Sequence, residues 1–352
     1  MPSFVDNSSN SLSHNVARYA LTLMVMFQAA GASAAKPFFT GLGMLRPDSI
    51  NSGAVGVSAD GSVVVGFAST TSSEQAFRWT LSEGMQGLGF FPGADSSYAN
   101  KVSDNGTIVG AGISANGLQG FIWTPEYGFE GIGFVPGVDT ASYAYTISGD
   151  GNTVVGNALN SDFKYEAIRW TKEEGIVLMG DLPGGEFGSG AVGVSQDGSV
   201  ALGYGTSSEG LQMAIWAPDQ GLVGLGDAPP SDLFGNVPTD LSADGTTAVG
   251  YAPFSGAFGT YLKAIRWTHE AGFLDLGQLP EGYENVAWSV SGGWFCNCWR
   301  SKFSPGTVHF GVSVDRATRY PAAPRTLGNP LVAGGQPFWV DTNTCGRRFN
   351  RR

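Results

Sequence analysis

A phrase of nine or ten residues recurs five times along the chain and constrains its fold more than any other feature. The first copy reads V-S-A-D-G-S-V-V-V-G, and the five copies begin at Val57, Val102, Ile147, Val194 and Leu241. Successive copies begin 45, 45, 47 and 47 residues apart. Self-similarity at a period of this length indicates an array of equivalent structural units. We therefore expect the chain to fold as a repeat protein.

Each unit shows the pattern of short antiparallel strands. Apolar residues alternate over short runs, as at Phe77 and Trp79 on either side of Arg78, and a period of two is typical of strands. The Asp-Gly and Asn-Gly pairs inside the phrase predict tight hairpins, because the turn they form needs positive φ at both central residues. The second unit is accordingly predicted to form four strands, near 98–103, 107–111, 120–124 and 128–133.

Each phrase is followed by a tryptophan, and then by a turn and a Leu-Gly dipeptide or a close variant. The tryptophans are Trp79, Trp123, Trp170, Trp216 and Trp267. The dipeptides are Leu88-Gly89, Ile132-Gly133, Met179-Gly180, Leu225-Gly226 and Leu276-Gly277, and an extra Leu42-Gly43 precedes the first phrase. A four-stranded unit of about 45 residues is the size of a β-propeller blade.

We predict an all-β fold, a β-propeller with five complete blades and a sixth that is interrupted. No single blade can bury both of its faces, so neighbouring blades must stack into a continuous core. The tryptophan is then expected to fill the space between adjacent blades. A β-solenoid is the alternative, although its coils are usually shorter than this period and lack a regular hairpin turn.

The repeat also carries a family resemblance. The pattern A-x-G-V-S-x-D-G-S-V-V-V-G at 54–66, followed by A-F-R-W-T at 76–80 and by the Leu-Gly turn, resembles the bacterial extracellular HAF repeat family over residues 41–293. The resemblance implies an exported or surface protein, sometimes the passenger of an autotransporter. It carries over no catalytic residue, because the family has no defined site.

The N-terminal residues have the features of an export signal. A mostly apolar run of 12 residues, Tyr19 to Ala30, follows Arg18 and precedes Gly31-Ala32-Ser33-Ala34. This pattern predicts a signal peptide over residues 1–34, cut near Ala34, with a buried helix as the alternative. The run is shorter than the roughly 20 residues that a membrane-spanning helix needs. We therefore expect an exported mature chain without a membrane span.

Charge is distributed unevenly along the chain. The formal net charge is -11. Residues 294–352 hold nine basic and two acidic side chains, net +7, which leaves net -18 for residues 1–293. An acidic body repels phosphate backbones, so nucleic acid is excluded as a partner of the body.

The repeat breaks where the charge changes sign. A sixth copy of the phrase starts on schedule at Val290 and is lost at Trp294. When codons for the residues from Trp294 onward are read one base later, they allow Gly-Ser-Ala-Ile-Val-Gly, which restores the phrase. We therefore hypothesise a single-base insertion or deletion just before Trp294. Residues 294–352 are then an aberrant basic tail, frameshifted or disordered, and the alternative is a genuine divergent tail.

The repeated acidic position of the phrase has two interpretations. It is occupied by Asp60, Asn105, Asp150, Asp197 and Asp244. Calcium loops place several oxygen ligands at alternate positions, whereas each phrase offers one carboxylate or none. Asp and Asn also stabilise turns by hydrogen-bonding to their own backbone. We expect these residues to shape turns, and we predict no metal site.

An arginine stands one residue before three of the tryptophans, as Arg78, Arg169 and Arg266. Arginine clusters hold a carboxylate in sialidase propellers, but repetition of one structural unit is the simpler explanation of this spacing. A site has to be argued from its own chemistry and not from the fold. We therefore expect a structural role for the three arginines.

Catalytic chemistry finds little support in the body of the chain. The cysteines, Cys296, Cys298 and Cys345, lie in the tail, and His269 is the only histidine between the leader and the tail. No cofactor is predicted. A glycosidase-like carboxylate pair stays open, because the loops carry acids that do not match between repeats, namely Glu166, Asp181, Glu186, Asp232 and Glu281. Nothing selects two of them, so the catalytic residues stay unknown.

The function predicted from the sequence is therefore that of an exported binding or interaction module. Its ligand, a protein or a glycan, is expected at the axial face or at the variable segments Ser161 to Glu166 and Ser231 to Pro238. One alternative is a carbohydrate-active hydrolase or lyase on the same scaffold. Another is a truncated pseudogene product that never closes a ring. The oligomeric state is left open.

Overall fold

The structure is a computed structural model that describes residues 41–217, 220–226, 235–256, 259–277 and 284–290, together with the backbone of two further strands within 295–315. The predicted signal peptide and most of the tail lie outside the described residues. Every regular element that is described is a β-strand. No helix among these residues has the length and apolar character needed to cross a membrane.

Each of the five repeats forms a four-stranded antiparallel unit, which we call blades 1 to 5. Blade 1 contains β1 (Asn51–Val57), β2 (Val63–Ser69), β3 (Glu74–Thr80) and β4 (Gly84–Gly89). Blade 2 contains β5 (Ser97–Val102), β6 (Ile108–Ser114), β7 (Gly117–Thr124) and β8 (Gly128–Gly131). Blade 3 contains β9 (Ser142–Ile147), β10 (Val154–Leu159), β11 (Tyr165–Thr171) and β12 (Gly175–Leu178).

Blades 4 and 5 follow the same order. Blade 4 contains β13 (Gly190–Val194), β14 (Ala201–Ser207), β15 (Gly210–Ala217) and β16 (Gly221–Gly224). Blade 5 contains β17 (Val237–Leu241), β18 (Thr247–Gly256), β19 (Gly259–Thr268) and β20 (Gly272–Asp275). The strands of each repeat pair with one another and not with the equivalent strand of the next repeat, which is the pairing of a propeller blade and not of a solenoid.

Three more strands begin a sixth unit. They are β21 (Glu284–Ser289), β22 (Phe295–Phe303) and β23 (Thr307–Asp315), and they pair antiparallel in that order. One parallel residue pair, Leu262 with Glu284, joins β21 to blade 5, so that blade 5 and these strands count as a seven-stranded sheet. The described part of the predicted tail is therefore paired strand, and its boundary at 293 stays a prediction.

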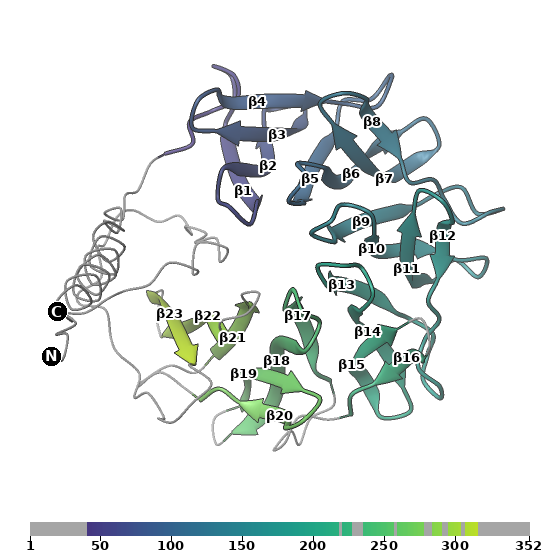
Figure 1. The fold of residues 1–352 in the computed structure, drawn as a ribbon, viewed down its shortest axis with the longest axis vertical. Helices are drawn as coiled ribbons and strands as arrows, with labels where there is room; N and C mark the ends of the chain where they lie inside the picture. The colour runs from purple at the N-terminus through teal and green to yellow at the C-terminus, as the bar shows by residue number, and fades with distance from the viewer. Residues whose placement is uncertain are drawn as a thin grey trace, which may run out of the picture. The chain divides into compact units, whose positions relative to one another are not determined.

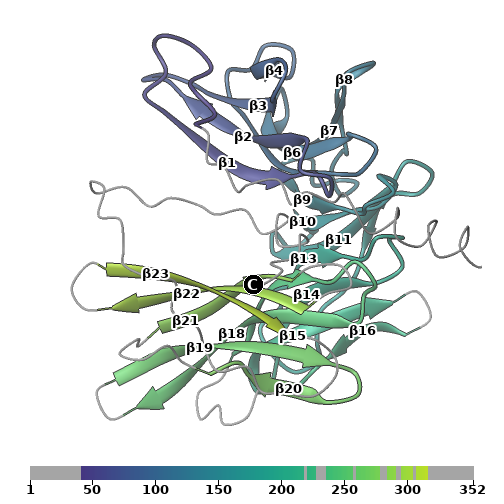
Figure 2. The same ribbon diagram turned by 60° about the vertical axis from the view of Figure 1, so that its left-hand side comes forward.

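The blades stack in chain order, as a β-propeller requires. Figures 1 and 2 show each blade beside the one that follows it, with β1, β5, β9, β13 and β17 on the inner side in Figure 1. Two ends of each blade can be told apart. The turn end carries the hairpins made by the repeat phrase. The loop end carries the hairpins between the second and third strands and the connections to the next blade.

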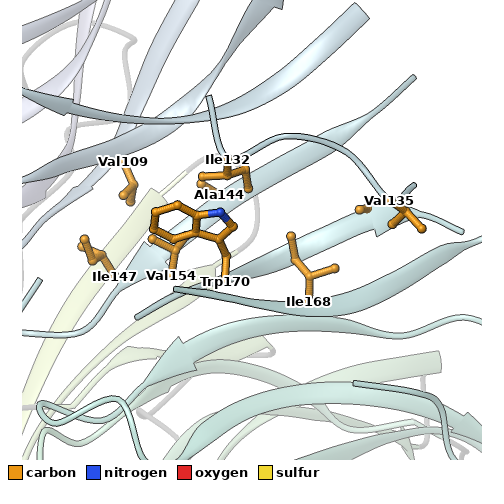
Figure 3. Packing of buried hydrophobic residues seen from close by; sticks show 9 residues of the cluster. Val109, Ile132, Val135, Ala144, Ile147, Val154, Ile168 and Trp170 are labelled. Carbon is orange, nitrogen blue, oxygen red and sulfur yellow. The ribbon is translucent and has the colours of Figure 1, made fainter. Parts of the chain in front are cut away.

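Four of the five repeat tryptophans lie between blades, as predicted. Trp170 of blade 3 is 7% exposed and packs in one cluster with Val109 and Ile132 of blade 2. Figure 3 shows its indole ring among Val154, Ala144 and Ile132. The tryptophans of blades 2, 4 and 5 each pack against a cluster that contains residues of the preceding blade. They are Trp123, Trp216 and Trp267.

A buried polar side chain clips each blade to the one before it. The Ser142 hydroxyl at the start of blade 3 accepts a hydrogen bond from the Gly120 backbone N–H at 3.1 Å and donates to the Gly133 carbonyl at 2.7 Å, both in blade 2. The same two bonds are made at the other blade junctions by Ser97, Ser189 and Asn236. A backbone donor and a backbone acceptor between blades are thereby satisfied by one residue.

The extra Leu42-Gly43 in the sequence is explained by the same contact. The Ser52 hydroxyl donates to the Gly43 carbonyl at 3.1 Å, as Ser142 does to Gly133. Gly43 has φ +83°, the value found at Gly133, where only glycine is relaxed. Residues 42–43 thus have the local geometry that ends the outer strand of a blade, although they precede blade 1.

The last glycine of the repeat phrase is required by close backbone contact. A Cβ atom added at Gly110 would lie 2.0 Å from the Tyr98 carbonyl oxygen, and one at Gly156 would lie 1.9 Å from that of Tyr143. The neighbouring inner strand is irregular here, with a register shift between Ala99 and Lys101 in blade 2. The bulge brings the carbonyl inward, so no side chain fits opposite it.

We predict that Ser142→Ala lowers the free energy of unfolding by about 1–3 kcal/mol, because it leaves the Gly120 N–H and the Gly133 carbonyl buried without partners. Urea denaturation measures the change. The matched control is Ser142→Asn, since Asn236 makes the same two bonds in blade 5, and it is expected to recover part of the loss. Equal stability of Ser142→Ala and wild type would contradict the clip.

Candidate ligand-binding site

The repeated acidic residues act as turn braces. Asp60 Oδ1 accepts hydrogen bonds from the Ser58 hydroxyl at 2.6 Å and from the Ser62 backbone N–H at 2.9 Å. These hydrogen bonds lower the pKa of Asp60 to about 2. The same brace recurs at Asn105, Asp150, Asp197 and Asp244. Among the described residues no group of three His, Cys, Asp or Glu side chains gathers as a metal site would require.

Two of the repeated arginines are held by their own blades. Arg78 forms an ion pair with Glu83 at 2.6 Å, and Arg169 forms one with Glu174. The Arg169 guanidinium also lies 5.8 Å from the centre of the Trp216 ring in blade 4. These contacts give Arg78 and Arg169 the structural role that the sequence predicts.

Three of the five unmatched acids, Glu166, Asp181 and Glu186, lie among the described residues. Glu166 is buried and accepts from the Asn160 amide and the Gly180 N–H. Asp181 accepts from three backbone N–H groups, those of Leu182, Gly188 and Thr206. Glu186 is exposed, and Asp232 and Glu281 lie outside the described residues. His269 lies beside the Trp267 ring, with 6.4 Å between the ring centres.

A feature not expected from the sequence is an aromatic side chain at one equivalent position in every blade. The position is a cross-strand pair between the first and second strands, at the loop end. The pairs are Gly53 with Phe67, Tyr98 with Ala111, Tyr143 with Asn157, Gly190 with Tyr204, and Val237 with Tyr251. A small residue faces each aromatic one in blades 1, 2 and 4. A Cβ atom at Gly190 would lie 2.7 Å from the Tyr204 ring, so the glycine makes room for it.

Blades 2 to 4 gather five tyrosines into one group, which we call the tyrosine cluster: Tyr98, Tyr143, Tyr145, Tyr165 and Tyr204. The Tyr143 ring stacks on that of Tyr145 with centres 5.7 Å apart, and it meets Tyr165 edge-on at 6.0 Å. Ring pairs at these separations attract beyond simple burial. The cluster offers partly buried ring faces with hydroxyl groups at their edges.

Burial raises the pKa of four cluster tyrosines. For Tyr143 the rise is the largest, and a hydrogen bond to Tyr165 adds to the effect of burial. Burial is also the leading cause for Tyr98, Tyr145 and Tyr204. Glu74 beside Tyr98 is the one charged side chain among the described groups that contribute to these shifts. The phenol groups of these four tyrosines are therefore uncharged at neutral pH.

Asn157 sits within this cluster and lacks one partner. It is 5% exposed, pairs across the sheet with Tyr143, and lies beside Tyr145 and Tyr204, where its amide opposes part of the rise in pKa that burial causes. Its Oδ1 has no hydrogen-bond partner. A buried acceptor without a donor is costly. It marks the point where a bound donor group would gain most.

Three exposed aromatic side chains lie in or next to the loops at the two ends of the segment from residue 160 to residue 189. Phe163 lies at the tip of the hairpin 160–164 with φ +57° and 69% exposure. A positive φ is uncommon for a bulky residue, and such positions concentrate at ligand sites. Asn160 Oδ1 fixes this hairpin by accepting from the N–H groups of Asp162 and Lys164. Tyr165 and Phe187 are also exposed, and the Ser189 N–H bonds to the Tyr165 carbonyl.

Of the two variable segments expected to hold the ligand, the first lies at the tyrosine cluster and the second is described only in part. Ser161 to Glu166 forms the hairpin tip and the start of β11, and it supplies Tyr165 to the cluster. Ser231 to Pro238 is described only from residue 235 onward. The sequence does not predict the remaining tyrosines as a site, because they do not recur in every repeat. The signal that could have identified them is that a large aromatic residue on one strand faces a small residue on the paired strand, as Tyr98 faces Ala111 and Tyr204 faces Gly190.

No protein-family model and no curated protein matches the chain. Among solved structures it is similar to a putative TolB from Agrobacterium tumefaciens, with 14% identity, a TM-score of 0.44, and coverage of 66% of this chain and 82% of that one. TolB from Acinetobacter baumannii matches at 13% identity and a TM-score of 0.43, over 68% of this chain and 61% of that one.

The β-propeller domain of the Trilobed protease from Pyrococcus furiosus is also similar, at 10% identity and a TM-score of 0.39, over 76% of this chain and 98% of that domain. Similarity at these levels says nothing about a ligand or an activity. The function has to be inferred from the chain's own residues.

We predict that high pH destabilises the protein through the tyrosine cluster. The folded-state pKa values lie above the usual tyrosine value of about 10. The unfolded chain therefore loses these protons first, and stability that is complete below about pH 10 falls as the pH rises further. Urea denaturation at a series of pH values measures the fall, and Tyr143→Phe is expected to make it shallower.

The matched control is Tyr127→Phe, because Tyr127 is 72% exposed and lies in the hairpin between β7 and β8 at the turn end. A pH profile that is the same for Tyr143→Phe and wild type would contradict the role of the buried hydroxyl.

Proposed function

We propose that the protein is an exported binding module that holds its ligand at the tyrosine cluster, on the loop end of blades 2 to 4. The observation that carries the proposal is the ring contact of Tyr143 with Tyr145 and Tyr165 beside Asn157, whose buried Oδ1 has no hydrogen-bond partner. Ligand sites combine apolar and aromatic surface with a few polar groups that orient the ligand. The cluster has this composition.

Export is supported by the sequence. The run from Tyr19 to Ala30 before Ala34 has the pattern of a signal peptide. The repeats resemble the HAF family, whose members are extracellular. A propeller displayed outside the cytoplasm can present its loop end to a soluble or surface-bound ligand.

Binding is favoured over catalysis by the condition of the carboxylates near the site. Glu166 and Asp181 are engaged by amide and backbone N–H groups. A glycosidase needs a carboxylic acid and a carboxylate on either side of the scissile bond. The hydrogen bonds that Glu166 and Asp181 accept give both residues a structural role in holding the loops.

We predict that the double variant Tyr143→Ala with Tyr165→Ala weakens ligand binding about tenfold or more, because it removes the central ring pair of the site. Binding of the mature chain is measured by calorimetry on the hits of an array of glycans and peptides. Tyr127→Ala, a variant of an exposed tyrosine at the turn end, is the control and is expected to bind as wild type does.

Two outcomes would contradict the proposed function. Unchanged affinity of the double variant, with its fold verified by circular dichroism, would place the ligand elsewhere. Release of new reducing ends from a bound polysaccharide, lost in Glu166→Gln, would identify a hydrolase instead.

A further inference from the structure

The unpartnered Oδ1 of Asn157 determines which chemical group a ligand of the tyrosine cluster has to carry. Asn157 is 5% exposed, and its Oδ1 has no hydrogen-bond partner. An amide oxygen can only accept hydrogen bonds. Tyr145 and Tyr204 lie beside this amide. The ligand therefore has to bring a hydrogen-bond donor to the depth of these two rings.

The surroundings of that acceptor favour a donor that is carried on an apolar framework. The rings of Tyr143 and Tyr165 form an edge-to-face pair with centres 6.0 Å apart, beside Asn157. Exposed aromatic faces pack well against C–H groups, while phenol hydroxyls both donate and accept. A flat ring with C–H groups on its faces and hydroxyls around its rim satisfies all of these groups together.

Charge argues against an acidic ligand. Glu74 is the charged side chain that acts on the described cluster, through Tyr98, and residues 1–293 carry net -18. A phosphate, sulfate or uronic acid group would meet this net negative charge, of which Lys164 in the hairpin 160–164 offsets only a small part.

We propose that the tyrosine cluster binds a neutral pyranose sugar and that Asn157 Oδ1 accepts a hydrogen bond from one of its hydroxyl groups. This inference rests on the proposed function, because it assigns a ligand class and a specificity-determining residue to the same site. The sugar ring stacks on Tyr143 and Tyr165, and its hydroxyl supplies the donor that Oδ1 lacks. Phe163, on the exposed hairpin tip, extends the aromatic surface for a longer chain of sugars.

The chain itself offers a variant that removes the acceptor and keeps the fold. In blade 2 the residue equivalent to Asn157 is Ala111, and it pairs with Tyr98 as Asn157 pairs with Tyr143. Asn157→Ala therefore recreates a pair that the same scaffold already accommodates. Asn116→Ala, in the exposed hairpin between β6 and β7 at the same end, is the matched control.

The test is calorimetric titration of the mature chain with neutral hexose oligosaccharides, with the corresponding uronic acid oligosaccharides, and with extended peptides. We expect the neutral sugars to bind, Asn157→Ala to weaken them about tenfold, as loss of one hydrogen bond does, and Asn116→Ala to have no effect. One monodeoxy derivative of the bound sugar should bind wild type as weakly as the parent sugar binds Asn157→Ala. That derivative and the parent should then bind Asn157→Ala equally.

Three results would overturn the inference. Preference for the uronic acids or for peptides, or failure of every neutral sugar to bind, rejects the ligand class. Full sugar affinity in Asn157→Ala, with binding still lost in the double variant of Tyr143 and Tyr165, rejects the role of Asn157 and leaves the proposed binding site intact. Full affinity in both variants rejects the site itself.

Discussion

The buried clip between blades is the contact on which the rest of the structure depends. One hydroxyl, such as that of Ser142, joins a strand N–H and an outer-strand carbonyl of the preceding blade. Packing of Trp170 against Val109 and Ile132 supplies apolar burial across the same boundary. Apolar packing does not depend on direction and allows neighbouring blades to shift, whereas the hydrogen bonds of the clip require a particular direction and distance. Together they fix each blade in one register on its neighbour, as an array of units that cannot fold alone requires.

The sequence predicts the parts of the fold that every repeat must solve in the same way. The brace at Asp60 and the glycine after it follow from turn chemistry, and the tryptophans follow from the need to fill the space between blades. The brace and the packing of four of the five tryptophans were confirmed, because a local rule or a shared burial demand determines them. The predicted turn type was wrong. It needs positive φ at both central residues, whereas Gly61 has φ +73° and Asp60 is not among the described residues with positive φ. The serine of the clip also recurs, but a lone serine at a strand start has no distinctive pattern until its partners in the previous blade are known.

The tyrosine cluster could not be predicted from periodicity, because it depends on departures from the repeat. Gly190 and Asn157 are the departures that matter. Gly190 leaves space for the Tyr204 ring, and Asn157 stands where blade 2 has Ala111. Each blade has an aromatic side chain at this position, from the first strand in blades 2 and 3 and from the second strand in blades 1, 4 and 5. A pattern that repeats identically in every blade does not record this alternation.

The two ends of the array differ in how much freedom they leave for a ligand. At the turn end the phrases bond to one another, from the Asp104 N–H to the Gly149 carbonyl and from the Asp150 N–H to the Gln196 carbonyl, and the Gln196 amide reaches Asp104 at 2.6 Å. Those backbone and side-chain groups already form hydrogen bonds that hold neighbouring turns together. At the loop end, the first and second strands of blade 3 instead carry tyrosine rings with their hydroxyls and the unpartnered Oδ1 of Asn157. Recognition is therefore expected at the loop end, because polar groups already satisfied within the fold have nothing further to offer a ligand.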